Sequence, residues 1–184
     1  MWQDMSRFGK KLFERGFVKS RFGNISIRLD DKMVITKTGF SLRNINGDSI
    51  VEIYIDKPSN LDTFASSEAI VHKEIYKNTP ARAIIHAHPI FAITESLLSD
   101  TDVIIPIDNE GQYLLHEIPI VRGDIGTSDL AIHTANALKN HKGVIVYSHG
   151  TFVIGDILED AYIFTDQIER SCRLKYNYEK KETI

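Results

Sequence analysis

Short apolar runs and stretches of helical spacing alternate along the chain. Near the N-terminus, Trp2, Met5, Phe8 and Leu12 recur at the period of an amphipathic helix, which Gly16 ends. Period-two alternation predicts strands over 24–28 and 50–55, with a hairpin return over 33–35. Continuous apolar runs predict strands over 83–88 and 144–148, and shorter strands are expected over 103–107, 113–121 and 151–154. The helical pattern predicts helices over 2–15, from Ser66 or Ser67 to about Lys77, from Pro89 to Leu98, from Thr127 or Ser128 to about Lys139, and from about Leu158 to Tyr176.

This mixture of hairpins and helices predicts an α/β fold with a mainly antiparallel central sheet, covered by helices on both faces. A doubly wound parallel sheet fits less well, because strands and helices do not alternate strictly. The sequence shows no internal repeat, low-complexity tract or linker, and its 184 residues suit one domain over 1–184.

Composition and charge argue against several classes of protein. The net charge is −3, from 22 basic and 25 acidic residues, and the basic residues are dispersed, so the sequence predicts no nucleic-acid partner. No apolar run approaches the roughly 20 residues of a membrane span, and the N-terminus lacks the apolar core of a signal peptide. Cys172 is the only cysteine, which excludes an intrachain disulfide and favours the cytoplasm.

Three histidines follow apolar strands. His86 and His88 lie two residues apart on one strand, so their imidazoles project from the same face. His149 follows the apolar run over 144–148 and can supply a third imidazole. Three neutral imidazoles with one open position form the ligand set of a catalytic zinc site. A pair of strand histidines alone is also compatible with ordinary core or surface positions.

Small-residue loops provide candidate anion sites. Gly23-Asn24 and Thr38-Gly39 lie in loops where backbone N–H groups can approach an anion. Ser66 and Ser67 open a helix, whose N-terminus favours phosphate, and Glu68 follows them. Each feature alone is also typical of an ordinary turn or cap. Together with the histidines and in this order, they form a specific set.

That ordered set resembles the class II aldolase/epimerase family over nearly the whole chain. The resemblance implies a three-layer α/β/α sandwich that assembles as a homotetramer with sites at subunit interfaces. It implies that Gly23, Asn24, Thr38, Gly39, Ser66 and Ser67 bind the substrate phosphate. It also implies that His86, His88 and His149 hold a divalent metal, usually Zn²⁺, and that Glu68 is the proton-transfer base and a metal ligand in the resting state.

The function implied is a zinc-dependent aldolase. It would cleave a small ketose 1-phosphate, such as a fuculose-1-phosphate-like sugar or a 5-deoxy- or methylthio-ribulose 1-phosphate, to dihydroxyacetone phosphate and an aldehyde. Glu110 or Tyr113 could act as the acid on the aldehyde oxygen. The alternatives are a sugar-phosphate 4-epimerase, a methylthioribulose-1-phosphate dehydratase, and a non-catalytic domain like the adducin head. Epimerases of the family tend to carry aspartate where this chain has Glu68.

The remaining histidines and acids are expected elsewhere. His72 lies four residues after Glu68, on the same helical face, and is interpreted as structural or as a support for the site. Surface or interface positions are expected for the following residues: His116, His133, His141, Glu117 and Asp124.

Overall fold

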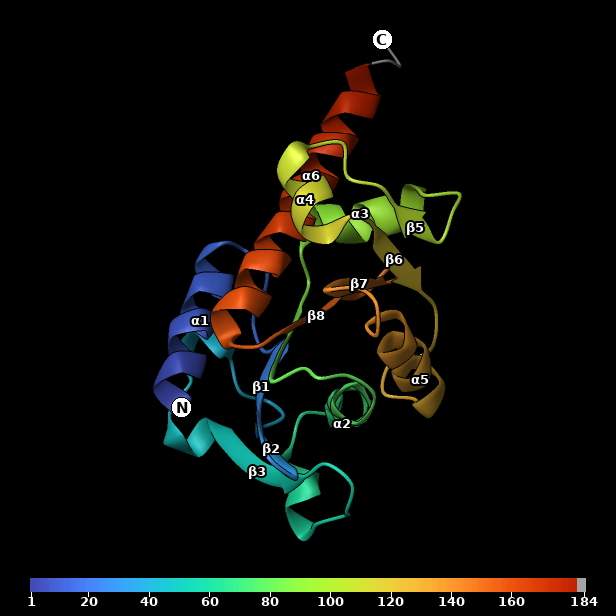
Figure 1. Cartoon of the computed structure of the whole chain (residues 1–184). Helices are drawn as coiled ribbons and strands as arrows, with labels where there is room; N and C mark the ends of the chain where they lie inside the picture. Colours follow the sequence, from blue (N-terminus) through green and yellow to red (C-terminus); the bar gives the residue numbers. More distant parts are fainter. Residues whose placement is uncertain (182–184) are drawn as a thin grey trace.

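The computed structural model describes residues 1–181, in which eight strands form one mixed sheet of order β3-β2-β1-β4-β8-β7-β6-β5 (Figure 1). The strands are β1 Asn24–Leu29, β2 Lys32–Thr36, β3 Ile50–Tyr54, β4 Ala83–Ala87, β5 Val103–Ile104, β6 Ile118–Val121, β7 Gly143–Val146 and β8 Gly150–Gly155. All neighbouring strands are antiparallel except β6 and β7, which run parallel. The predicted α/β fold with a mostly antiparallel sheet is therefore confirmed, and one βαβ crossover makes the sheet mixed.

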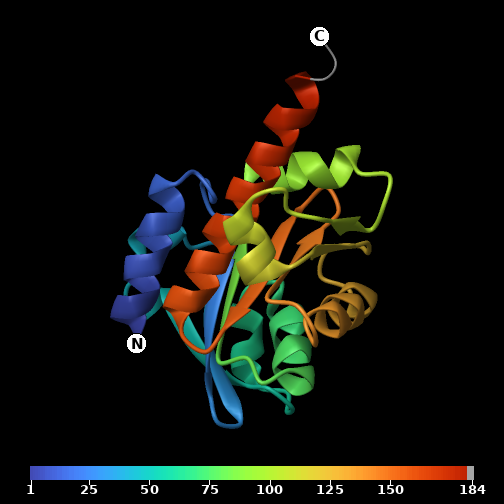
Figure 2. The ribbon, with the colours of Figure 1, turned by 45° about the horizontal axis from the view of Figure 1, so that its top comes forward.

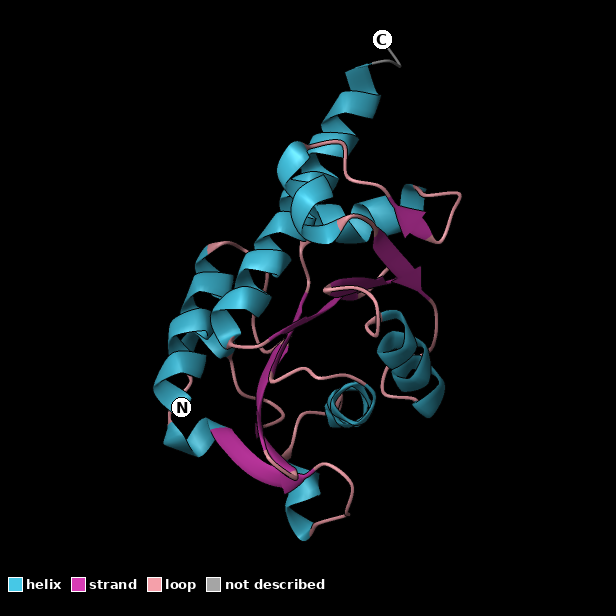
Figure 3. Cartoon of the chain, viewed as in Figure 1, coloured by secondary structure: helices cyan, strands magenta, loops and turns pink. Residues whose placement is uncertain are grey.

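Helices connect most of the strands (Figure 3). They are α1 Trp2–Glu14, α2 Ala69–Asn78, α3 Ile90–Leu98, α4 Asn109–Leu115, α5 Ser128–Ala137 and α6 Leu158–Lys181, with short 3-10 helices over Leu42–Asn44, Gly47–Ser49 and Asn60–Phe64. Among the described residues, no helix has both the length and the apolar character needed to cross a bilayer.

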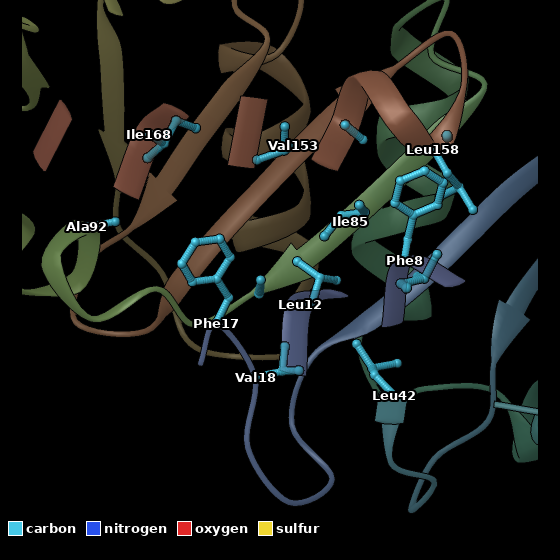
Figure 4. Close-up of a cluster of buried hydrophobic side chains, with 14 of the residues drawn as sticks. Phe8, Leu12, Phe17, Val18, Leu42, Ile85, Ala92, Val153, Leu158 and Ile168 are labelled. Atoms are coloured by element: carbon cyan, nitrogen blue, oxygen red, sulfur yellow. The ribbon is translucent and has the colours of Figure 1, made fainter. Parts of the chain in front are cut away.

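Two hydrophobic clusters lie against the sheet, because alternate strand residues point to opposite faces. In β4, Ile85 packs in one cluster with Leu12 of α1 and Ile168 of α6 (Figure 4). Its neighbour Ile84 packs in the other cluster, with Ile75 of α2 and Leu130 of α5. Figures 1 and 2 accordingly show α1 and α6 on one side of the sheet and α2 and α5 on the other.

The predicted strand over 113–121 is wrong in its first part, because this segment begins inside helix α4. Asp108 caps that helix by accepting a hydrogen bond from the backbone N–H of Gly111 at 2.9 Å. Leu115 is buried where α4 packs on α6. A short apolar run such as 113–115 has no period that separates a strand from a buried helix turn, so packing on α6 decides the conformation.

Other boundaries shift by a few residues. Helix α2 begins at Ala69 rather than at Ser66 or Ser67, although the Ser66 hydroxyl accepts a hydrogen bond from the N–H of Glu68 at 3.3 Å. Strand β5 is shorter than the predicted 103–107, and α6 extends beyond Tyr176. Thr127 caps α5 as expected, accepting from the N–H of Leu130.

The loops that line the pocket described below lie at one edge of the sheet. Strand β1 is antiparallel to β4, so Asn24 at its start lies opposite His86 near the end of β4. Strands β6 and β7 are parallel, so the loop after β6 and the turn after β7 leave the sheet at the same edge.

Candidate active site

A pocket of about 650 Å³ opens at this edge of the sheet. It is lined by the ends and loops of several elements, namely by Arg21, Phe22, Gly23, Asn24, Lys37, Thr38, Gly39, Ser66, Ser67, Glu68, His88, Gly123, Asp124, Ile125, Tyr147, Ser148 and His149. Segments far apart in the sequence, from residue 21 to residue 149, therefore converge on one cavity.

The three predicted histidines meet at the inner end of the pocket. His86, His88 and His149 each offer a ring nitrogen, and these nitrogens lie within 4.8 Å of one another. The Nε2 atoms of His86 and His88 are 2.9 Å apart. The Nδ1 of His86 donates to the carbonyl oxygen of Thr151 at 2.9 Å, which leaves its Nε2 for the cluster.

The tight turn between β7 and β8 presents His149 to the other two histidines. Its N–H donates to the carbonyl of Val146 at 3.0 Å, and Ser148 in the turn has a positive φ of 57°. Gly150 follows, where a Cβ atom would come within 2.4 Å of the carbonyl oxygen of Ala87 and 2.8 Å of the His88 ring. Glycine at 150 therefore allows β8 to approach β4 closely beneath the histidine cluster.

The carboxylate of Glu68 lies beside the histidines and is only 6% exposed. Its Oε2 lies 2.9 Å from the Nε2 of His86 and accepts a hydrogen bond from the Nδ2 of Asn24, also at 2.9 Å. Its Oε1 lies 3.7 Å from the Nε2 of His149 and has no hydrogen-bond partner. Burial alone would raise the pKa of Glu68, but His86, His149 and Asn24 favour the anion and lower the pKa to about 2.

Two of the three histidines, His88 and His149, lie where the neutral ring, the form that binds metals, is favoured. Burial, followed by the neighbouring His86, lowers the pKa of His88 to about 3 and also lowers that of His149. Three imidazoles whose ring nitrogens lie within 4.8 Å of one another, with a buried carboxylate oxygen beside them that has no hydrogen-bond partner, form a donor set that suits a divalent cation such as zinc. The residues present therefore fit a metal ion.

A second set of buried polar groups lies behind Glu68. Asn24 is held on both sides, since its Nδ2 donates to Glu68 and its Oδ1 lies 2.5 Å from the Nε2 of His72. The Nδ1 of His72 lies 2.7 Å from the hydroxyl of Ser26, which lies 2.8 Å from the hydroxyl of Tyr76. His72 thus contacts Asn24 behind the pocket and does not line the pocket itself.

The predicted phosphate residues line the outer part of the pocket. Thr38 and Gly39 follow β2, and Ser66 and Ser67 precede α2, whose N-terminus opens toward the cavity. Gly23 has φ of +82°, and a Cβ atom there would meet the carbonyl of His86 at 2.9 Å, so this loop requires glycine.

Glu110 and Tyr113, the candidate acids, lie outside the pocket. Both are on α4, Glu110 is exposed, the Tyr113 side chain is 80% exposed, and neither lines the pocket of its own chain. His116 and His133 are exposed as expected, and His141 pairs with Glu117 at 2.9 Å.

Asp124 and its neighbours were not expected at the site. Gly123, Asp124 and Ile125 follow β6, and Tyr147 and Ser148 follow β7, and all five line the pocket. The parallel pairing of β6 and β7 brings these segments together, so a βαβ crossover recognised over 118–146 would have indicated them.

Residues 3–176 match the family described as the Class II Aldolase and Adducin N-terminal domain. The chain belongs to this family.

Relatives within the family carry two activities in their names. The chain is 29% identical over 180 residues to a 3-oxo-tetronate 4-phosphate decarboxylase of Haemophilus influenzae, covering 92% of this chain and 84% of that protein. It is 30% identical over 168 residues to an L-fuculose phosphate aldolase of Methanocaldococcus jannaschii, covering 90% of each.

A solved structure of this family shares the fold throughout. The L-fuculose-1-phosphate aldolase from Thermus thermophilus superposes with a TM-score of 0.93 and 28% sequence identity, over 99% of this chain and 95% of that one. Lyases are thus among the most similar family members, both in sequence and in structure.

Proposed function

We propose that this chain is a divalent-metal-dependent aldolase that cleaves a small ketose 1-phosphate to dihydroxyacetone phosphate and an aldehyde. The observation that carries the proposal is the position of Glu68, whose carboxylate lies 2.9 Å from His86 and 3.7 Å from His149 at the inner end of the pocket. A carboxylate that could transfer a proton thus lies beside three imidazoles that could hold a metal ion, which supports the proposal.

Three groups of residues would have separate roles in the reaction. Thr38, Gly39, Ser66 and Ser67 would bind the substrate phosphate, remote from the reacting bond, and so orient the ketose. His86, His88 and His149 would hold zinc or another divalent ion, which supplies an electron sink for the negative charge that develops on the substrate oxygens. Glu68 would move the proton to or from the carbon at which the bond breaks.

The two activities named among the relatives share one intermediate. Breaking the C3–C4 bond of a ketose 1-phosphate leaves the bonding electrons on C3 and the C2 carbonyl, giving the enediolate of dihydroxyacetone phosphate and an aldehyde. Loss of CO₂ from a 3-oxo-tetronate 4-phosphate leaves the electrons on C2 and the C3 carbonyl, and this gives the same enediolate. Protonation of that carbon completes either reaction, so one site can serve both.

A specific observation favours decarboxylation as the second candidate. Aldol cleavage needs a group that takes the proton of the C4 hydroxyl, and Glu110 and Tyr113 lie outside the pocket of their own chain. Release of CO₂ needs no such group, because the carboxylate leaves without a proton. Arg21 and Lys37 also line the pocket and could bind a substrate that carries both phosphate and carboxylate.

A product assay distinguishes these functions. The zinc-loaded protein is incubated with fuculose 1-phosphate, 5-deoxyribulose 1-phosphate, methylthioribulose 1-phosphate and 3-oxo-tetronate 4-phosphate, and dihydroxyacetone phosphate, aldehyde and CO₂ are measured. We expect dihydroxyacetone phosphate with a stoichiometric aldehyde. The unphosphorylated counterparts of the three ketoses, incubated in parallel, should not react. Dihydroxyacetone phosphate with CO₂ alone would select the decarboxylase. An epimer, or loss of water without bond cleavage, would contradict both lyase assignments, and complete inactivity would favour a non-catalytic role.

A further inference from the structure

A buried row of polar side chains leads from Glu68 away from the pocket. The hydroxyls of Tyr76 and Ser26 are 2.8 Å apart, and the Ser26 hydroxyl lies 2.7 Å from the Nδ1 of His72. The Nε2 of His72 lies 2.5 Å from the Oδ1 of Asn24, whose Nδ2 donates to the Oε2 of Glu68 at 2.9 Å. All five side chains, called the relay below, are at most 6% exposed.

Each hydrogen bond of the relay is donated in the direction of Glu68, and this direction follows from the carboxylate at the end of the relay. An ionised carboxylate only accepts hydrogen bonds, so Asn24 must turn its NH₂ group toward Glu68. The carbonyl oxygen of the same amide then faces His72 and can only accept. The Nε2 of His72 must therefore carry a proton.

The other half of the relay follows from the charge of His72. The His72 ring is fully buried, and its two hydrogen-bond partners are a neutral amide oxygen and a neutral hydroxyl, so a neutral ring with one N–H is favoured there. Burial correspondingly lowers the pKa of His72. Its Nδ1 must accept, and the hydroxyl of Ser26 is the donor. Ser26 in turn accepts from the hydroxyl of Tyr76, whose pKa is raised by burial.

Strand β1 and helix α2 carry the relay, and the side-chain period of each element places its relay residues on one face. Asn24 and Ser26 are two residues apart on β1 and share a face of the strand. Glu68, His72 and Tyr76 are four residues apart and share a face at the start of and along α2. A member that lost its partner would leave a buried polar atom unsatisfied, which costs about 1–3 kcal/mol.

We propose that His72 is a positioning residue, which fixes the orientation of the Glu68 carboxylate through Asn24, and that Ser26 and Tyr76 fix the tautomer of His72. The role rests on the proposed function, in which Glu68 moves a proton. With Oε2 held by Asn24, the carboxylate presents Oε1, which has no hydrogen-bond partner, to the reacting groups. Without the relay the Asn24 amide can turn over and place its oxygen against the carboxylate.

The tautomer of His72 tests the relay without any enzymatic activity. We expect ¹⁵N NMR of the wild-type protein to show a protonated Nε2 and an unprotonated Nδ1, both before and after zinc is added. Ser26→Ala removes the donor to Nδ1, and we expect it to yield a mixture of the two tautomers. A wild-type His72 protonated at Nδ1, or a tautomer unchanged in Ser26→Ala, would overturn the proposal.

A pair of substitutions tests the effect on Glu68. His72→Phe fills the site but cannot donate, whereas the side-chain amide of His72→Gln can still donate to Asn24. We expect His72→Phe to slow solvent-proton exchange at C3 of dihydroxyacetone phosphate about 10- to 100-fold, the usual effect of losing such a supporting group. Its KM for the phosphate-anchored substrate should be little changed, and His72→Gln should recover most of the rate. His133→Gln, on an exposed face of α5, is the matched control and should exchange at the wild-type rate.

The outcomes separate the two proposals. A folded His72→Phe that exchanges at the wild-type rate, or equal losses in His72→Phe and His72→Gln, would show that His72 does not position Glu68. If wild type itself neither exchanges nor cleaves any substrate, the proposed function is wrong, and the NMR experiment then decides the direction of the relay by itself.

Discussion

Glu68 shows how several neighbours determine the chemistry of one residue. Burial opposes its charge, yet His86, His149 and Asn24 together stabilise the anion and lower its pKa to about 2. One carboxylate oxygen is held by Asn24, and the other has no hydrogen-bond partner. Such a carboxylate stays ionised and can bind a cation, and its role as a base in the proposed function follows from its position beside the histidines rather than from a raised pKa.

Glu68→Gln should separate these two roles. The substitution keeps the shape and removes the basicity, while the three histidines stay in place. We expect the variant to retain most of its zinc and to lose roughly 10²- to 10⁴-fold in turnover, the usual contribution of a positioned base. Elemental analysis and the product assay measure both. A variant that turns over and exchanges the C3 proton as fast as wild type would show that Glu68 is not the base.

The sequence predicts the members of this site better than their contacts. The spacing of His86 and His88 on one strand indicates a shared face, and the structure places them there. Asn24 was expected to bind phosphate, but its side-chain amide contacts Glu68 and His72. That partnership depends on the pairing of β1 with β4 and on the packing of α2, and a single sequence specifies neither.

At the scale of elements, the site depends on strand ends that share one edge. The β1–β2 hairpin can be predicted from alternation, and the strand that carries His86 can be predicted from its continuous apolar run. The parallel pairing of β6 with β7 and the helical state of 109–115 cannot, because both depend on contacts between distant segments. The pocket residues that the sequence missed after β6 and β7, namely Gly123 to Ile125, Tyr147 and Ser148, follow from that parallel pair.

Gly150→Ala tests the close approach of β8 to β4. The added Cβ would lie 2.4 Å from the Ala87 carbonyl, a backbone atom that cannot move without shifting β4. We expect a loss of about 1–3 kcal/mol in the free energy of unfolding and a weaker affinity for zinc, since His88 and His149 flank the contact. Gly47→Ala, where nothing lies within 4 Å, is the matched control and should stay within about 0.5 kcal/mol of wild type. Urea unfolding and zinc titration measure both quantities, and equal behaviour of the two variants would contradict the packing argument.

At the scale of the whole molecule, the apolar surface suggests assembly. Leu97 and Leu98 at the end of α3, Ile105 and Ile107 after β5, and Tyr113 on α4 are all exposed. Helix α4, which carries Glu110 and Tyr113, lies away from the pocket of its own chain, so these two residues could act only in the pocket of a neighbouring subunit. The family resemblance suggests a homotetramer with sites at such interfaces.

Light scattering tests the assembly directly. We expect a mass near four times the 20.9 kDa of one chain at micromolar concentration. Leu98→Asp, which places a charge in the exposed apolar surface, should lower that mass, because a buried unpaired charge is costly at an interface. A wild-type protein with the mass of a single chain would refute the tetramer and with it any role of Glu110 and Tyr113 in a neighbouring pocket.

The stability of the metal-free protein should depend on pH through His72. Burial lowers its pKa in the folded state from 6.5 to about 3, so between these values the unfolded chain binds a proton that the folded chain does not. The free energy of unfolding must therefore fall as pH falls below 6.5, and one such group contributes up to about 1.4 kcal/mol per pH unit. His88 and His149 have lowered pKa values as well, and they act equally in wild type and in His72→Gln.

The difference between these two proteins isolates His72. The free energy of unfolding is measured by urea unfolding at one protein concentration, with chelator present. Below about pH 6.5 it should fall less steeply with pH for His72→Gln than for wild type. Above about pH 7.5 the two curves should run parallel, because a histidine is then neutral in both the folded and the unfolded state. Glu68 does not disturb this comparison, because its lowered pKa adds stability that is lost only as pH falls below 4.5. If the two proteins lose stability equally between about pH 6.5 and 5, His72 takes up a proton in the folded state. A protonated His72 could not accept the hydrogen bond from Ser26, and the relay would then lack its direction.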